Sequence, residues 1–135
     1  MSRILFGIFI VLHGLVHLWY VTLSQRLVEF QPEMGWTGES WLFSPLLGDA
    51  ATRWLATVLY GLATLGFVMG GIGIFAQQAW WRPLVIGSAA FSAVIILLFW
   101  DGGLHMLVEK GLIGFLINVA LLVALLIFDW PSARF

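Results

Sequence analysis

Four apolar stretches separated by polar segments give this chain its pattern. They cover residues 4–23, 54–75, 84–100 and 112–128. At about 1.5 Å per helical residue, each would be roughly 25 to 33 Å long, which matches the hydrocarbon core of a bilayer. An open sheet would leave unpaired backbone groups in lipid, so helices are expected in all four. The pattern predicts an all-α protein, a four-transmembrane-helix bundle.

The segments between these stretches differ in length. The two later connections, residues 77–83 and 101–111, are short, so the helices that they join should run antiparallel. The first connection, residues 24–53, is longer and mixes large apolar side chains with acidic ones. Such a mixture is typical of chain at the level of lipid headgroups. We therefore expect a long, partly interfacial loop that caps one end of a single integral membrane domain, residues 1–135.

Composition supports the membrane assignment and excludes several classes of function. Hydrophobic residues make up 61% of the chain and charged residues only 10%, whereas a soluble domain carries about a quarter charged residues. The formal net charge of −1 argues against a nucleic-acid partner. The absence of cysteine excludes disulfides and thiolate metal sites. The expected partner is the lipid bilayer, and a larger membrane complex or a homo-oligomer is compatible with the sequence.

Small residues indicate where helices pack closely, because helix contacts in membranes are enriched in them. The second stretch carries a face of alanines and glycines spaced by three, four or seven positions, and the first carries two glycines two turns apart. These residues are Ala56, Ala63, Gly66, Gly70 and Gly73, and Gly7 and Gly14. We expect close-packed helix contacts at both places.

His13 and His17 are the best pointer to function. They lie one helical turn apart inside the uncharged first stretch, where an ionisable side chain is costly and by default marks a site or a buried polar contact. Counting depth along each helix places Tyr60 and Asn118 in the same half of the membrane, and Tyr20 on the same helix face as the histidines. These five residues form the predicted ligand site.

Several roles fit this group. Two imidazoles at i and i+4 can share a metal ion or bind haem, with Asp101, His105 or Glu109 as further ligands. The residue after His13 is glycine rather than glutamate, so a zincin-type metalloprotease is not indicated. A pocket between helices could instead hold a small amphiphile such as a quinone or a lipid, whose oxygen atoms the polar side chains would bind.

Two further alternatives remain open. A histidine that titrates near neutral pH could serve a small proton-coupled transporter, although the first stretch holds no carboxylate. The histidines could also be purely structural, bonded across helices to Asn118, Tyr60 or a backbone carbonyl. The chain would then be a structural subunit of a membrane complex.

The layout resembles a known group of proteins. The glycine-and-histidine first helix FGIFIVLHGLVHL and the ending WDGG…GLIGFLINVALLVALL look like those of small bacterial DoxX-like membrane proteins. The resemblance implies a multi-pass protein of the bacterial inner membrane and identifies no catalytic residue. Some members of the group are similar to the membrane subunit of a thiosulfate:quinone oxidoreductase. We therefore expect a binding or accessory subunit for a quinone-like ligand in a membrane redox system. Both termini are expected in the cytoplasm, because Arg3 and the amino group flank the first stretch while the acidic residues cluster on the other side.

Overall fold

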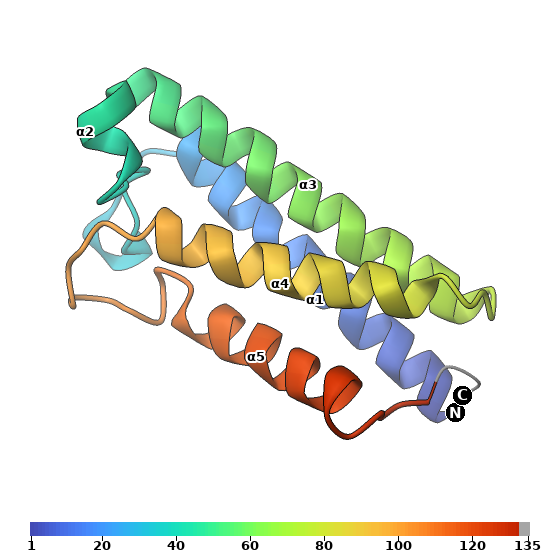
Figure 1. Cartoon of the computed structure of the whole chain (residues 1–135). Coiled ribbons are helices and arrows are strands. Elements are labelled where there is room, and N and C mark those ends of the chain that lie inside the picture. Colours follow the sequence, from blue (N-terminus) through green and yellow to red (C-terminus); the bar gives the residue numbers. More distant parts are fainter. Residues whose placement is uncertain (133–135) are drawn as a thin grey trace.

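A computed structural model describes residues 1–132, and every regular element in that range is a helix (Figure 1). The long helices are α1 (Ser2–Ser24), α3 (Asp49–Phe75), α4 (Trp81–Leu98) and α5 (Leu112–Leu126). A 3-10 turn, η1 (Pro32–Met34), and a short helix, α2 (Phe43–Leu47), interrupt the first connection. The membrane character predicted from hydropathy is confirmed, because α1, α3 and α4 are apolar and long enough to cross a bilayer.

The fourth predicted stretch gives a shorter helix than expected. α5 is strongly apolar but has only 15 residues, a length of about 22 Å against a hydrocarbon core of about 30 Å. The stretch 112–128 was therefore longer than the helix within it. Hydropathy reports the apolar side chains of the stretch, and these continue past Leu126, where the helix ends.

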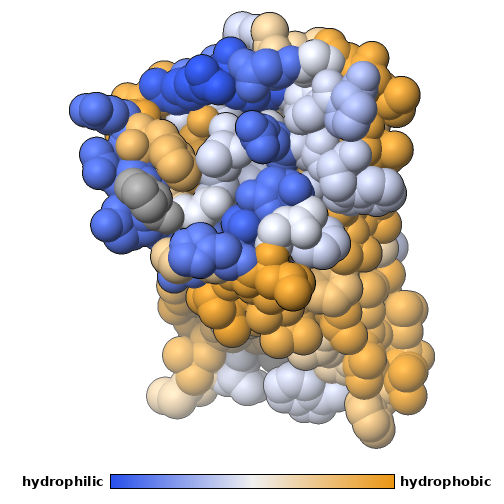
Figure 2. Space-filling model, turned by 90° about the vertical axis from the view of Figure 1, so that its left-hand side faces the viewer, coloured by the Kyte–Doolittle hydropathy of each residue, from blue (hydrophilic) through white to orange (hydrophobic). Residues whose placement is uncertain are grey.

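Helix contacts follow the order of the chain. α1 packs mainly along α3, α3 also packs against α4, and α5 packs against α4. Two buried apolar clusters form between them, one around Tyr60 and Phe99 towards the long loop and one around Phe67 and Trp81 towards the termini. Figure 2, which looks onto the loop end, shows hydrophilic side chains gathered there and hydrophobic flanks beside and below them, as a membrane-embedded surface requires.

Glycines allow the close approach of these helices, on two different faces of α3. A Cβ atom added at Gly14 would lie 2.6 Å from the Cβ of Phe67, where α1 meets α3. Added at Gly70, it would lie 2.6 Å from a methyl group of Val85, where α3 meets α4. Both predicted groups of small residues thus contain glycines at close helix contacts, as packing in lipid favours.

The loop between α1 and α2 covers the end of α4. The last carbonyl groups of a helix lack partners within it. Here four consecutive carbonyls at and just after the end of α4, in residues 97–100, each accept a hydrogen bond from the loop. The donors are the side chains of Trp36, Ser40 and Trp41 and the backbone N–H of Trp41. These bonds attach the loop to the bundle.

We expect the variant Trp36→Phe to loosen this attachment. The buried indole donates to the carbonyl of Phe99 at 2.8 Å, and phenylalanine would leave that carbonyl without its donor, at a cost of about 1 to 2 kcal/mol. Local opening should then be about 5- to 30-fold more frequent. The measurement is the rate of tryptic cleavage at exposed Arg26 in detergent. Trp54→Phe, at an exposed tryptophan, is the control, and equal cleavage of both variants would contradict the anchoring role.

Candidate functional site

A closed hydrogen-bond ring joins the two histidines to two other helices. His13 Nε2 lies 2.7 Å from Asn118 Oδ1, and Asn118 Nδ2 donates to Ser92 Oγ at 2.8 Å. Ser92 Oγ lies 2.5 Å from His17 Nε2, and His17 Nδ1 lies 2.9 Å from the backbone carbonyl of His13. All four side chains are buried, and Asn118 is 0% exposed.

The partners define the proton positions around the ring. A carbonyl oxygen can only accept, so Nδ1 of His17 carries the hydrogen, and in the neutral imidazole Nε2 accepts from the Ser92 hydroxyl. That hydroxyl accepts in turn from Asn118, whose carbonyl oxygen takes the Nε2–H of His13. Every bond therefore has one donor and one acceptor, with both histidines neutral.

The ring links α1 to two helices with which it has little other contact. His13 and His17 belong to α1, Ser92 to α4 and Asn118 to α5, while α1 itself packs mainly along α3. His13 is the central residue of α1, so the ring lies near the middle of the membrane-spanning part. In a medium without water, such cross-helix bonds hold helices together. The predicted cross-helix bond between a histidine and Asn118 is present. His17 bonds across helices to Ser92 instead, and the backbone carbonyl that it contacts belongs to its own helix.

The histidines do not offer two uncommitted nitrogens to one metal ion. Of the four ring nitrogens, His13 Nδ1 alone makes no hydrogen bond within residues 1–132. Its ring stacks on Phe9 and meets Phe67 edge to face, with centroids 6.1 and 4.8 Å apart. A metal or haem site at both histidines stays a prediction, and it would require breaking bonds of the ring.

The proposed further ligands lie elsewhere. α4 ends at Leu98, and the chain from Asp101 to Lys110 runs through bends and turns rather than a continued helix. Asp101 forms a largely buried ion pair with Lys110 at 3.1 Å, and His105 is exposed. Across the part of the chain that the structure describes, no three histidine or carboxylate side chains are grouped so as to hold a metal ion.

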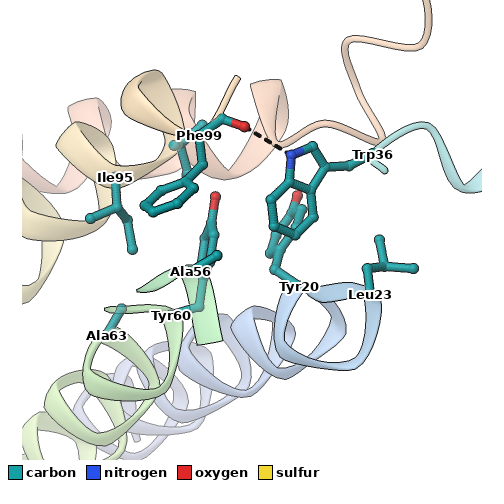
Figure 3. Packing of buried hydrophobic residues seen from close by; sticks show 9 residues of the cluster. Tyr20, Leu23, Trp36, Ala56, Tyr60, Ala63, Ile95 and Phe99 are labelled. Carbon is teal, nitrogen blue, oxygen red and sulfur yellow. Dashed lines mark hydrogen bonds between the residues drawn. The ribbon is translucent and has the colours of Figure 1, made fainter. Parts of the chain in front are cut away.

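Two buried tyrosines lie between the ring and the loop. The rings of Tyr20 and Tyr60 stack with centroids 4.8 Å apart, and the Trp36 indole stands edge-on to both (Figure 3). Tyr20 is 8% and Tyr60 2% exposed. Neither hydroxyl makes a hydrogen bond to any residue in 1–132, whereas buried tyrosine hydroxyls usually have a partner. The two hydroxyls are therefore donors available to a ligand or to water.

A cavity of about 500 Å³ adjoins Tyr20. Its walls come from α1, from η1 and the residue before it, and from the chain just before α5. Besides Tyr20, its polar lining residues are Gln31, Glu33 and Glu109, and the other lining side chains are apolar. The exposed Trp19 and Val16 stand at its α1 side. Glu109, a candidate metal ligand from the sequence, thus lies in one cavity with a predicted ligand-binding tyrosine.

Comparison with known proteins gives no relative whose site could guide the interpretation of this one. No family model, no curated protein and no solved structure matches the chain.

The structure groups the five predicted site residues into two sets. His13, His17 and Asn118 belong to the ring, and Tyr20 and Tyr60 form the stacked pair. The His17 and Tyr60 rings connect the sets, with centroids 6.1 Å apart. Sequence reasoning did not include Ser92 in the site, although its polar side chain near the middle of an apolar stretch was the available signal.

Proposed function

We propose that this protein is a four-helix, multi-pass protein of the bacterial inner membrane, with α5 as the fourth membrane helix. The two ends of the α5 region support this. The Tyr20 hydroxyl lies beside Gly111, just before α5, because a Cβ added there would be 3.1 Å from it. After α5, Trp130 meets Phe6 with ring centroids 6.2 Å apart. The two ends of this region therefore approach opposite ends of α1.

The contact between Trp130 and Phe6 bears on how the protein is oriented in the membrane. Because Trp130 lies against Phe6 near the start of α1, it is at the same end of the molecule as the N-terminus. Figure 1 shows the red end of the described chain beside N, as an even number of crossings requires. We place this end in the cytoplasm, with Arg3 beside the amino terminus. The acidic long loop then faces the opposite side of the membrane.

The function we propose is to bind a lipid-soluble, quinone-like ligand, as a binding or accessory subunit of a membrane redox system. The observation that carries the proposal is Tyr20, a buried tyrosine that lines an open-sided cavity and whose hydroxyl has no partner within residues 1–132. Tyr60, which stacks on Tyr20, supplies a second hydroxyl without a partner in these residues. Carbonyl oxygens of a quinone-like head are acceptors that match two phenol donors. Few polar groups in an otherwise apolar cavity are typical of a small-molecule site. The hydrogen-bond ring around the two histidines lies next to this pair of tyrosines and supports it by joining α1 to α4 and α5.

The test is binding of a short-tailed benzoquinone to the purified protein in detergent. Quenching of tryptophan fluorescence should be saturable, because Trp19 lines the cavity and Trp36 touches both tyrosines. Tyr20→Phe and Tyr60→Phe keep the ring stack but remove one donor each, so each should weaken binding about 3- to 10-fold.

Thr64→Val is the matched control. It also removes a buried hydroxyl, but that hydroxyl bonds to a backbone carbonyl of its own helix. Its affinity should equal that of the wild type. A wild-type protein without saturable quenching, or phenylalanine variants that bind as tightly as the control, would overturn the proposed function.

A further inference from the structure

Two carboxylates in the wall of the cavity beside Tyr20 have no cation to neutralise them. Glu33 and Glu109 both line the cavity, and within residues 1–132 neither forms an ion pair or a side-chain hydrogen bond. The basic residues on this side of the molecule are already paired: Arg26 and Arg53 with Asp49, and Lys110 with Asp101. The cavity therefore carries uncompensated negative charge.

The fold brings these carboxylates together from distant parts of the chain. Glu33 belongs to η1, and Glu109 precedes α5. The two segments touch at Gly35, where an added Cβ would lie only 2.7 Å from the Cβ of Glu109. The backbone of Gly35 also has φ +79°, a conformation that residues other than glycine rarely adopt. The approach of the loop to residue 109 thus depends on this glycine.

A separate observation indicates that the cavity takes a ligand. Tyr20, only 8% exposed, lines the cavity and has an unpartnered hydroxyl. A ligand that uses this donor must compete with the lipids around the protein, which far outnumber it. Some of these membrane lipids are anionic. Unpaired charge of the same sign repels such competitors.

We propose that Glu33 and Glu109 are specificity-determining residues that exclude anionic amphiphiles from the cavity. The site admits amphiphiles with a neutral or cationic head and rejects those with a carboxylate or phosphate head, such as fatty acids and acidic lipids. This inference rests on the proposed function, because it specifies the head group of the ligand that Tyr20 receives.

The experiment compares three amphiphiles that share one alkyl tail and differ in the head: an alcohol, a trimethylammonium and a carboxylate. Each is titrated directly into the purified protein, and its affinity is measured by calorimetry without the benzoquinone present. In the wild type, the carboxylate should bind at least about tenfold more weakly than the alcohol, and the trimethylammonium at least as tightly as the alcohol. Added salt should reduce these differences.

Removing the charges should change the order of affinities. Glu33→Gln and Glu109→Gln should each tighten carboxylate binding about 3- to 10-fold, weaken trimethylammonium binding, and leave alcohol binding unchanged. Glu39→Gln is the control, because Glu39 is an exposed carboxylate of the same loop that does not line the cavity. It should leave all three affinities unchanged.

The outcomes separate the two proposals. If the benzoquinone and the alcohol bind but the carboxylate binds equally well, and the glutamine variants do not alter the order, charge selection is wrong and the proposed function stands. If the trimethylammonium alone binds, charge selection stands and the quinone-like ligand is wrong. If none of the amphiphiles binds the wild type, both are wrong.

Discussion

The variant Asn118→Leu is expected to lower the free energy of unfolding by about 2 to 4 kcal/mol. Asn118 is fully buried and supplies two consecutive bonds of the ring, to His13 and to Ser92. Leucine is similar in size but leaves both partners unsatisfied, at about 1 to 3 kcal/mol for each buried group. Measured cross-helix bonds in membranes are weaker on average, so a loss near the upper end would indicate that the ring acts as a unit. Equilibrium unfolding in mixed detergent micelles measures the change.

Two comparisons make this test specific. Thr64→Val removes a buried hydroxyl outside the ring and should cost less than about 1 kcal/mol. His17→Phe should cost clearly less in the Asn118→Leu background than alone, because the ring is then already open. His17 and Asn118 share Ser92 as a partner and do not bond to each other. Strictly additive costs, or an Asn118→Leu variant as stable as Thr64→Val, would show that the ring is not a cooperative unit.

The contact between His13 and Asn118 follows from the sequence, because the position of a residue along a membrane helix gives its depth in the bilayer. Residues at similar depth in neighbouring membrane helices can meet, and each residue advances a helix by a fixed rise. The same argument cannot say which way a helix is turned about its axis. The rotation of α4 points Ser92 into the ring, and that rotation depends on packing against α3 through Gly66 and Gly70.

Spacing likewise identified the small-residue face of α3 without indicating which helix covers it. Gly66, Gly70 and Gly73 approach side chains of residues 80–88, in and just before α4. α1 instead packs on another face, where Gly71 meets Val11. A periodic pattern shows that residues share a face, but their partner depends on the tertiary arrangement of all helices.

The cavity was the part of the site that the sequence could not supply. Its two carboxylates come from irregular segments, whose course depends on non-local contacts rather than on a periodic pattern. Trp36 bonds to the end of α4, and Gly35 allows the loop to approach Glu109. Without those contacts, the sequence offered Glu109 only the role of a further metal ligand, together with Asp101 and His105.

The variant Gly14→Ala should separate α1 from α3 and lower stability by about 1 to 3 kcal/mol. The added Cβ would lie 2.6 Å from the Cβ of Phe67 and 3.3 Å from the carbonyl oxygen of Thr64. Neither atom belongs to the flexible end of a side chain, so the helices must move apart. The shift would also disturb the ring, because the carbonyl of Gly14 lies 3.2 Å from Nδ1 of His17.

Gly61→Ala is the matched control for this packing effect. Gly61 also lies inside a long helix, α3, but an added Cβ would meet nothing within 4 Å. Alanine is the better helix former by up to about 1 kcal/mol, so this variant should be as stable as the wild type or more stable. Both variants gain the same methyl group, and unfolding in the same detergent therefore isolates the helix contact. If Gly14→Ala proved as stable as Gly61→Ala, close packing at Gly14 would not contribute to the stability of the α1–α3 pair.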